Sequence, residues 1–148
     1  MVDSSDRSVI SALTRDHRQI EEMLARLQTA TEPEERRKLL DEVTTQIVHH
    51  ADAEDKYLYR VVREAIPRGA IDIDKQIAAH TKIKTMIDEL NEHGDAANGE
   101  SAPLVSELIA EVHQNILNEE HGVFAWLVQW VDESTLAEIG DQVAALRK

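Results

Sequence analysis

Two segments with the same pattern decide the fold of this chain. Residues 17–27 read HRQIEEMLARL and residues 80–90 read HTKIKTMIDEL. In both segments a histidine precedes an isoleucine by three positions, and further apolar residues follow at helical spacing. This spacing is typical of an amphipathic helix with one buried face. His17 and His80 lie on that apolar stripe, so we expect both imidazoles to project toward the core.

A second pair of segments repeats in the same order. Residues 50–59 read HADAEDKYLY and residues 115–124 read NILNEEHGVF, so a glutamate and an aromatic residue align at corresponding positions. Self-similarity of this kind indicates a duplicated structural unit. We therefore predict two helical hairpins of one pattern, related by an approximate two-fold axis.

The predicted fold is all-α, an up-down antiparallel four-helix bundle with a short C-terminal helix, in a single domain over residues 1–148. Strand-like alternation is not sustained anywhere in the sequence, and short connections between long helices imply antiparallel neighbours. Proline and glycine residues mark the breaks between the helices. We expect helices at about 6–28, 33–66, 72–93 and 102–130, and a tail helix at about 135–147.

Composition argues against several classes of function. Asp and Glu outnumber Lys and Arg by 29 to 16, which gives a net charge of −13 and repels the phosphates of nucleic acids. The absence of cysteine excludes thiolate chemistry. No apolar run reaches the roughly 18 residues of a membrane span, and the first residues lack the order of a secretory signal. We therefore expect no membrane association and a cytoplasmic location.

A metal site is predicted where the repeated segments meet. His50 and Glu54 are spaced i and i+4, about 40° apart around a helix, so both can point into the bundle at one level. Glu119 occupies the position that corresponds to Glu54. One inward histidine is ordinarily a hydrogen-bonded core residue, but several histidines and carboxylates together are costly to bury without a metal. Nitrogen and oxygen donors suit iron, manganese or zinc, and carboxylates from two helices can bridge two ions.

The order of these motifs resembles the hemerythrin-like HHE cation-binding family. The resemblance rests on Asp16 and His17, on the block at residues 50–59, on His80, and on the block at residues 119–124. It implies a helical bundle that holds two iron ions joined by an oxo or hydroxo bridge. The ligands implied are His17, His50, Glu54, His80 and Glu119, with Glu54 and Glu119 as the bridging carboxylates.

The chain departs from the family pattern at Asn115, where the second HxxxE block would require histidine. Asn115 can ligate through its amide oxygen, hold a water, or leave the second metal open, and the change also fits a weak or lost second site. His113 precedes Glu119 by six residues and points about 120° away, so it reaches the site only through a bulge or a rotamer swing. Lys84 replaces the second histidine of oxygen-carrying hemerythrins, which makes reversible oxygen carriage less expected.

Tyr57 follows Glu54 by three residues and is a candidate ligand or hydrogen-bond donor, with a satisfied core aromatic as the alternative. The function expected is that of a non-haem di-iron protein that binds or reduces oxygen, hydrogen peroxide or nitric oxide, with peroxide-consuming, catalase-like activity as one form. The main alternative is a metal-dependent sensor or stress-response module with little turnover. A bundle that has lost its metal is a third interpretation. No feature identifies a protein partner.

Overall fold

The computed structural model describes residues 8–92 and 102–146, and its regular elements there are all helical, as predicted. Those elements are α1 (Val9–Thr29), α2 (Pro33–Ala53), η2 (Glu54–Leu58), α3 (Tyr59–Ala65), α4 (Gly69–Glu92), α5 (Ala102–Asn118), η4 (Glu119–Val123), α6 (Phe124–Trp130) and α7 (Glu133–Leu146). Here η denotes a π-helical turn, in which hydrogen bonds join residues five apart rather than four.

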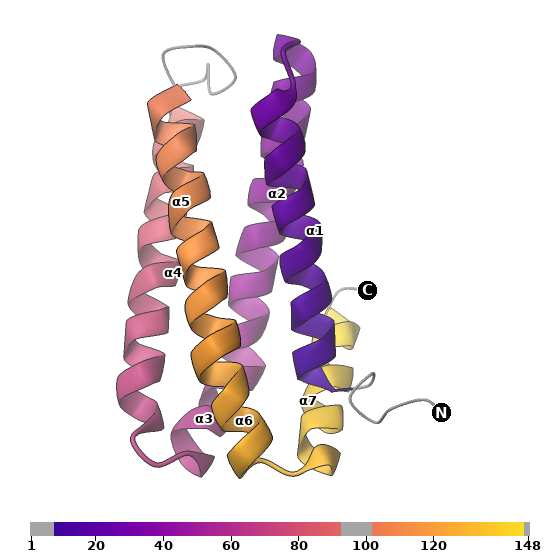
Figure 1. Ribbon diagram of the computed structural model, residues 1–148, viewed down its shortest axis with the longest axis vertical. Coiled ribbons are helices and arrows are strands. Elements are labelled where there is room, and N and C mark those ends of the chain that lie inside the picture. Colours follow the sequence, from indigo (N-terminus) through magenta and orange to yellow (C-terminus); the bar gives the residue numbers. More distant parts are fainter. Residues whose placement is uncertain (1–7, 93–101, 147–148) are drawn as a thin grey trace.

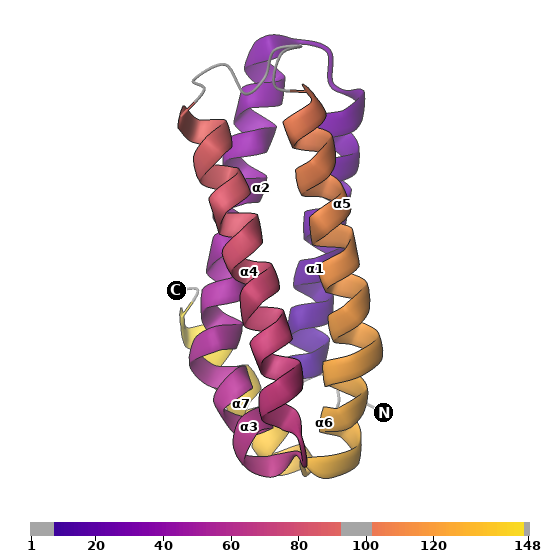
Figure 2. The same cartoon turned by 90° about the vertical axis from the view of Figure 1, so that its left-hand side faces the viewer.

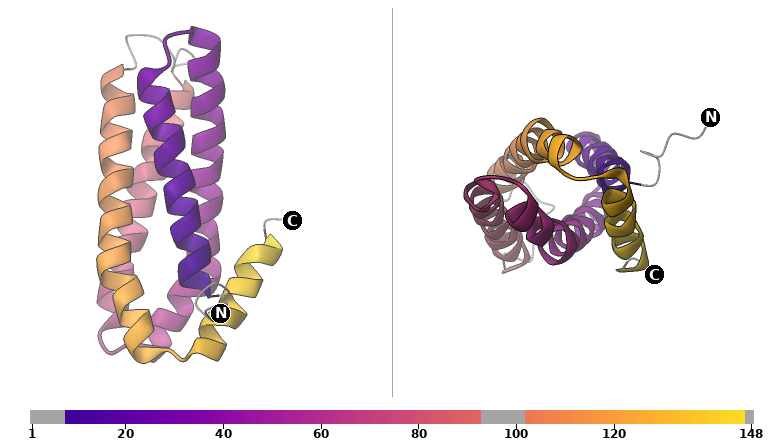
Figure 3. Two further views of the ribbon diagram at one scale, coloured as in Figure 1. Left: turned by 45° about the vertical axis from the view of Figure 1, so that its right-hand side comes forward. Right: turned by 90° about the horizontal axis from the view of Figure 1, so that it is seen from below.

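Long helices pack side by side along the longest axis of the molecule (Figures 1 and 2). The helix pairs with the most extensive contacts include α1 with α2 and α4 with α5. The segments α2, η2 and α3 follow one another without a break, as do α5, η4 and α6. Seen from below, these helices surround a common axis and α7 lies outside them, against α1 (Figure 3).

Two helices begin earlier than the sequence predicted. Helix α4 begins at Gly69 because Arg68 adopts the left-handed region at φ 64°, which reverses the chain at once. A Cβ at position 69 would lie 2.3 Å from the carbonyl oxygen of Val62, so only glycine fits there. Helix α7 begins at Glu133 because the Asp132 side chain caps it, accepting from the backbone N–H of Thr135 at 2.7 Å. The predicted limits at about 6, 93 and 147 lie outside the described residues.

The apolar interior is divided into two cores. The first core lies between α1, α2, α4 and α5. Its members include Ile20, Leu24, Val43, Ile47, Ile83, Leu108 and Ile116. The second core lies beneath it at the end formed by α3, α6 and α7, and includes Val9, Leu13, Leu58, Tyr59, Phe124, Leu127 and Ile139. Along each long helix, the two cores are separated by buried polar residues. This polar layer consists of His17, His50, Glu54, Gln76, His80, Asn115 and Glu119.

Helix α7 closes the second core from the outside. Its buried residues Leu136, Ile139 and Val143 pack among the apolar side chains of that core, and α7 contacts both α1 and the η2 turn. Among the described residues, no helix combines the length and the apolar character that a membrane crossing requires.

Candidate metal centre

The polar layer contains five side chains that the sequence predicted as metal ligands. The exposed fractions are 1% for His17, 7% for His50, 4% for His80, and 0% for both Glu54 and Glu119. They come from α1, α2, α4 and the first residues of the two π turns. Ionisable groups buried so completely are strongly destabilising unless each charge is met by a partner of the opposite sign.

Two imidazoles and two carboxylates form the centre of this layer. The Nε2 atoms of His17 and His50 face each other at 3.0 Å. Glu119 Oε1 lies 3.1 Å from Nε2 of His17, and Glu54 Oε1 lies 3.1 Å from Nε2 of His50. One donor atom from each of these four residues lies within 4.8 Å of the other three. Ligand atoms on opposite sides of an ion bound at about 2.1 Å are about 4.2 Å apart, so this spacing suits one metal ion.

His80 joins the centre through the carboxylates rather than through the other imidazoles. Its Nε2 lies 3.4 Å from Glu54 Oε1 and 3.4 Å from the hydroxyl oxygen of Tyr59. The Tyr59 hydroxyl in turn donates to Glu119 Oε2 at 2.8 Å. Glu54 is therefore shared between His50 and His80, the position that a bridging carboxylate would occupy.

A carboxylate stands behind each of the three histidines. The Nδ1 atom lies 2.6 Å from Glu120 Oε2 in His17, 3.0 Å from Asp16 Oδ2 in His50, and 3.2 Å from Asp55 Oδ1 in His80. An acceptor at Nδ1 favours the tautomer that carries the proton there, so each Nε2 directs its lone pair at the centre. Lone pairs facing one another at 3.0 Å require a cation or a proton between them.

These three carboxylates were not predicted to have a role of their own, although each is adjacent in sequence to a predicted ligand. Asp16 is adjacent to His17, Asp55 follows Glu54, and Glu120 follows Glu119. Helical spacing does not predict these contacts, because a neighbour on a helix points about 100° away from the candidate ligand beside it. Asp16 supports His50 on the next helix, and Glu120 supports His17 from η4.

Three buried carboxylate oxygens have no hydrogen-bond donor. They are both oxygens of Glu54 and Oε1 of Glu119. The histidine Nε2 atoms near them are within 3.1 to 3.4 Å but do not have the direction of a hydrogen bond. Buried acceptors are almost always paired in native proteins. A cation coordinated by these oxygens and by the histidine lone pairs would satisfy both.

The electrostatics of the cluster are those of a site that attracts positive charge. Burial lowers the pKa of His50, but Glu54 and Glu119 outweigh it and raise that pKa to about 10. Burial likewise lowers the pKa of His80, yet its contacts with Asp55 and Glu54 raise it to about 9. Burial and the nearby Glu119 raise the pKa of Glu54. Burial opposes the ionisation of Glu119, but its close contacts with Glu54 and His17 hold its pKa well below the usual range.

The phenol at the centre belongs to Tyr59 and not to Tyr57. Tyr57 was predicted from α-helical spacing, which places i+3 on the face of Glu54. In η2 the Tyr59 backbone N–H donates to the carbonyl of Glu54, so the residue five positions on takes that face. Tyr57 is half-buried, with the Lys56 ammonium 5.2 Å from its ring centroid. Burial raises the pKa of Tyr59 well above 10, which keeps its hydroxyl a donor.

The two π turns repeat the same arrangement in both halves of the chain. Phe124 donates its backbone N–H to Glu119, as Tyr59 does to Glu54. The Tyr59 ring stacks on His80 at a centroid distance of 5.6 Å, and Phe124 stacks on His17 at 5.7 Å. Each glutamate is thus followed, one π turn later, by an aromatic ring that holds a histidine of the other hairpin.

The remaining candidates occupy different places. Asn115 lies in the polar layer and donates through Nδ2 to Gln76 Oε1 at 2.7 Å. His113 is 46% exposed, with Nδ1 3.5 Å from Glu21 Oε2, and the π turn that follows Glu119 cannot rotate it inward. Glu21 pairs with Arg18 as well. Lys84 pairs with Asp52 at 2.7 Å.

Comparison with known proteins agrees with this geometry. Residues 8–127 match the family model described as the hemerythrin HHE cation-binding domain. That range contains all seven residues of the polar layer and both π turns. Searches of curated proteins and of solved structures give no significant match.

Proposed function

Because this chain belongs to the hemerythrin HHE cation-binding family, we propose that its polar layer holds two iron ions and that this centre binds or reduces a small oxidant. The scaffold we propose is the up-down antiparallel bundle expected from the sequence. The five predicted ligands are His17, His50, Glu54, His80 and Glu119, with both glutamates shared between the ions. Manganese and zinc use the same donor types and are the competing metals.

One observation carries the proposal: the three carboxylate oxygens without a donor face three histidine Nε2 atoms whose lone pairs converge on them. Protonation alone satisfies this cluster only if the pKa of His50 rises to about 10 and the pKa of His80 rises to about 9. A divalent cation satisfies the oxygens and the imidazoles at once. The donor set of imidazole and carboxylate is that of iron sites in helical bundles.

The two ions would be held unequally. His17, His50, Glu54 and Glu119 surround the first position, whereas His80 and the shared carboxylates serve the second. Asn115 stands where the repeat would supply another imidazole, and its Nδ2 is already engaged by Gln76. We therefore expect a tight first site and a weaker second site that keeps a position open for an exogenous ligand.

The protein's own residues prepare that open position for a small molecule. A cavity of about 20 Å³, room for about one water, lies among the three histidines, Asn115 and aliphatic side chains. The apolar wall, which includes Ile20 and Ile116, limits access of water. Tyr59 keeps its proton and donates it to Glu119 Oε2, which holds that carboxylate in place beside His80. When bound, iron supplies the electrons and the Lewis acidity for reduction.

The test is elemental analysis of protein purified without added metal, with visible absorption recorded before and after peroxide. Two irons per chain, near-ultraviolet charge-transfer bands and loss of peroxide support the proposal. A variant with His17→Gln and His50→Gln is the matched control, and we expect it to lose the tight site. Less than a tenth of an equivalent of metal, persisting after anaerobic incubation with ferrous iron, refutes the proposal.

A metal-dependent sensor is the second candidate, because one packing contact favours it. Helix α7 lies against η2, the turn whose first residue is the buried Glu54, so a change at Glu54 has a direct route to the outside of the bundle. In a sensor, metal binding protects α7 from hydrogen exchange and peroxide is not consumed. Exchange measured by mass spectrometry with and without iron distinguishes this from turnover.

A further inference from the structure

The two halves of the polar layer differ at three positions that are adjacent in space. Asn115 stands where the repeat has His50, Gln76 where it has Leu13, and Ala79 where it has Asp16. In the first hairpin, Asp16 supports His50 at 3.0 Å. In the second hairpin the carboxylate and the imidazole are both gone, and Gln76 and Asn115 bond to each other at 2.7 Å instead. Leu13 is apolar and fully buried, so Gln76 places a polar side chain where the first hairpin has an apolar one.

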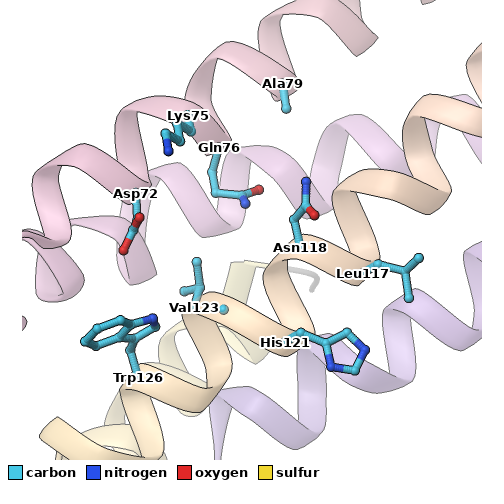
Figure 4. Close-up of a pocket in the computed structure, with 10 residues that line it drawn as sticks. Asp72, Lys75, Gln76, Ala79, Leu117, Asn118, His121, Val123 and Trp126 are labelled. Carbon is cyan, nitrogen blue, oxygen red and sulfur yellow. The ribbon is translucent and has the colours of Figure 1, made fainter.

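This amide pair lies between a surface groove and a small buried cavity. On the outside is a groove of about 580 Å³ between α4 and the α5–η4–α6 run, which we call the α4–α5 groove. Figure 4 shows Gln76 extending from α4 toward the helix that carries Asn118 and Val123. On the inside, Asn115 lines the cavity of about 20 Å³ beside the three histidines. Both residues are buried. Gln76 lines the groove, Asn115 lines the cavity and the two are hydrogen-bonded, so the pair lies between the two spaces.

We propose that the α4–α5 groove admits a small, uncharged, hydrogen-bonding oxidant of the hydrogen peroxide type, and that the Gln76–Asn115 pair is the gate through which it reaches the cavity. This inference rests on the proposed function and names the route and the substrate class for the same centre. The gate is made of two neutral amides, which neither attract nor repel a neutral molecule by charge.

The chemistry of the pair favours peroxide over dioxygen. A hydrogen peroxide molecule can donate to Gln76 Oε1 and accept from Asn115 Nδ2, so it replaces the hydrogen bond that its passage breaks. Dioxygen has no proton to donate and leaves the Gln76 carbonyl unpaired, which is unfavourable in a buried position. A single neutral hydrogen bond contributes modestly to stability, so the gate can open often without unfolding.

Access is measured with hydroxylamine, which near neutral pH is an uncharged, hydrogen-bonding analogue of hydrogen peroxide, and with cobalt(II)-loaded protein, whose visible spectrum reports ligand binding without any turnover. The blocking variant is Ala79→Phe, because Ala79 lines the groove beside Gln76 and is not a predicted ligand. The matched control is Thr45→Phe in a second groove, which touches His50 from the α1–α2 side. Ala79→Leu serves as a smaller block if the phenylalanine variant folds poorly, as judged by circular dichroism.

A blocked route slows association and dissociation equally, so it leaves the dissociation constant unchanged. We expect both rate constants for hydroxylamine to fall at least tenfold in Ala79→Phe, with wild-type values within twofold in Thr45→Phe. Unchanged rates in Ala79→Phe, or an equal loss in the control, overturn the gate while the metal centre stands. Lys84, which pairs with Asp52, also lines the cavity, so faster binding in Lys84→Ala with no effect of Ala79→Phe also overturns it. Failure to bind cobalt refutes the metal centre itself.

Discussion

The stability of the metal-free protein should fall as pH rises above neutrality. His50 and His80 have pKa values raised from 6.5 to about 10 and about 9, so the folded state holds protons that the unfolded state has released. A raised pKa contributes stability that is fully present below the unfolded value of 6.5 and is lost as pH rises through the folded values. The raised pKa of Glu54 acts in the same direction. Stability should therefore decline from about pH 6.5 to about pH 10.

The size of the decline follows from proton linkage. Each extra proton in the folded state changes the free energy of unfolding by about 1.4 kcal/mol per pH unit. The two imidazoles share Glu54, so their pKa shifts are not additive. We therefore expect the folded state to hold one more proton than the unfolded state in this range. From pH 7 to pH 9 the free energy of unfolding should fall by about 3 kcal/mol, a large part of the total for a small domain.

The assay is urea unfolding of chelator-treated protein followed by circular dichroism at intervals between pH 6.5 and pH 10. His50→Gln should flatten the slope, whereas His113→Gln, at an exposed position, should leave it unchanged. Metal reverses the trend, since ligands must lose their protons to bind it, and metal affinity should rise with pH. A metal-free protein whose stability is constant or increases from pH 7 to pH 9 would refute the electrostatic account of the centre.

Three further outcomes are expected. Gly122→Ala should stabilise the protein by up to about 1 kcal/mol, because a Cβ at position 122 meets nothing within 4 Å and glycine is unfavourable in a helix. Gly69→Ala should destabilise the protein, because its Cβ would clash with the backbone of Val62. Thermal unfolding compares the two variants, and equal effects contradict the argument. Asp16→Asn should weaken the tight metal site about 10- to 100-fold by loosening His50, measured by competition with a chromophoric chelator, and an unchanged affinity would deny Asp16 this role. Asn115→His should raise the affinity of the weaker second metal, and calorimetric titration that shows only the wild-type steps speaks against a ligand position there.

Much of this candidate centre was predictable because the side chains proposed as ligands follow helical periodicity. His17, His50, Glu54, His80 and Glu119 sit on the apolar faces of their helices, and a helix that buries its apolar face must bury these residues too. The repeat then places these side chains, which come from different helices, at one level of the bundle. The structure gathers all five in the polar layer, and the all-helical fold and the family are confirmed.

Periodicity failed where the backbone left α geometry. The sequence does not show that π turns begin at Glu54 and Glu119. A spacing of 3.6 residues per turn offered Tyr57 as a candidate ligand or hydrogen-bond donor, with a core aromatic as the alternative. The π turn moves the inward face to the fifth residue, which brings Tyr59 to Glu119. Helix starts at Gly69 and Glu133 were misplaced for a similar reason, since a left-handed residue and a side-chain cap are local geometries that many sequences tolerate.

The sequence by itself determined an all-helical chain with two matching hairpins, an acidic surface, and a set of imidazoles and carboxylates facing inward. Only the tertiary structure decided which acceptor supports which histidine, because Asp16, Asp55 and Glu120 each serve an imidazole on another helix. It alone also joined Gln76 to Asn115, residues of different helices that no spacing along one chain relates. Periodicity fixes the face on which a side chain lies, whereas partners across the bundle depend on how the helices pack against one another.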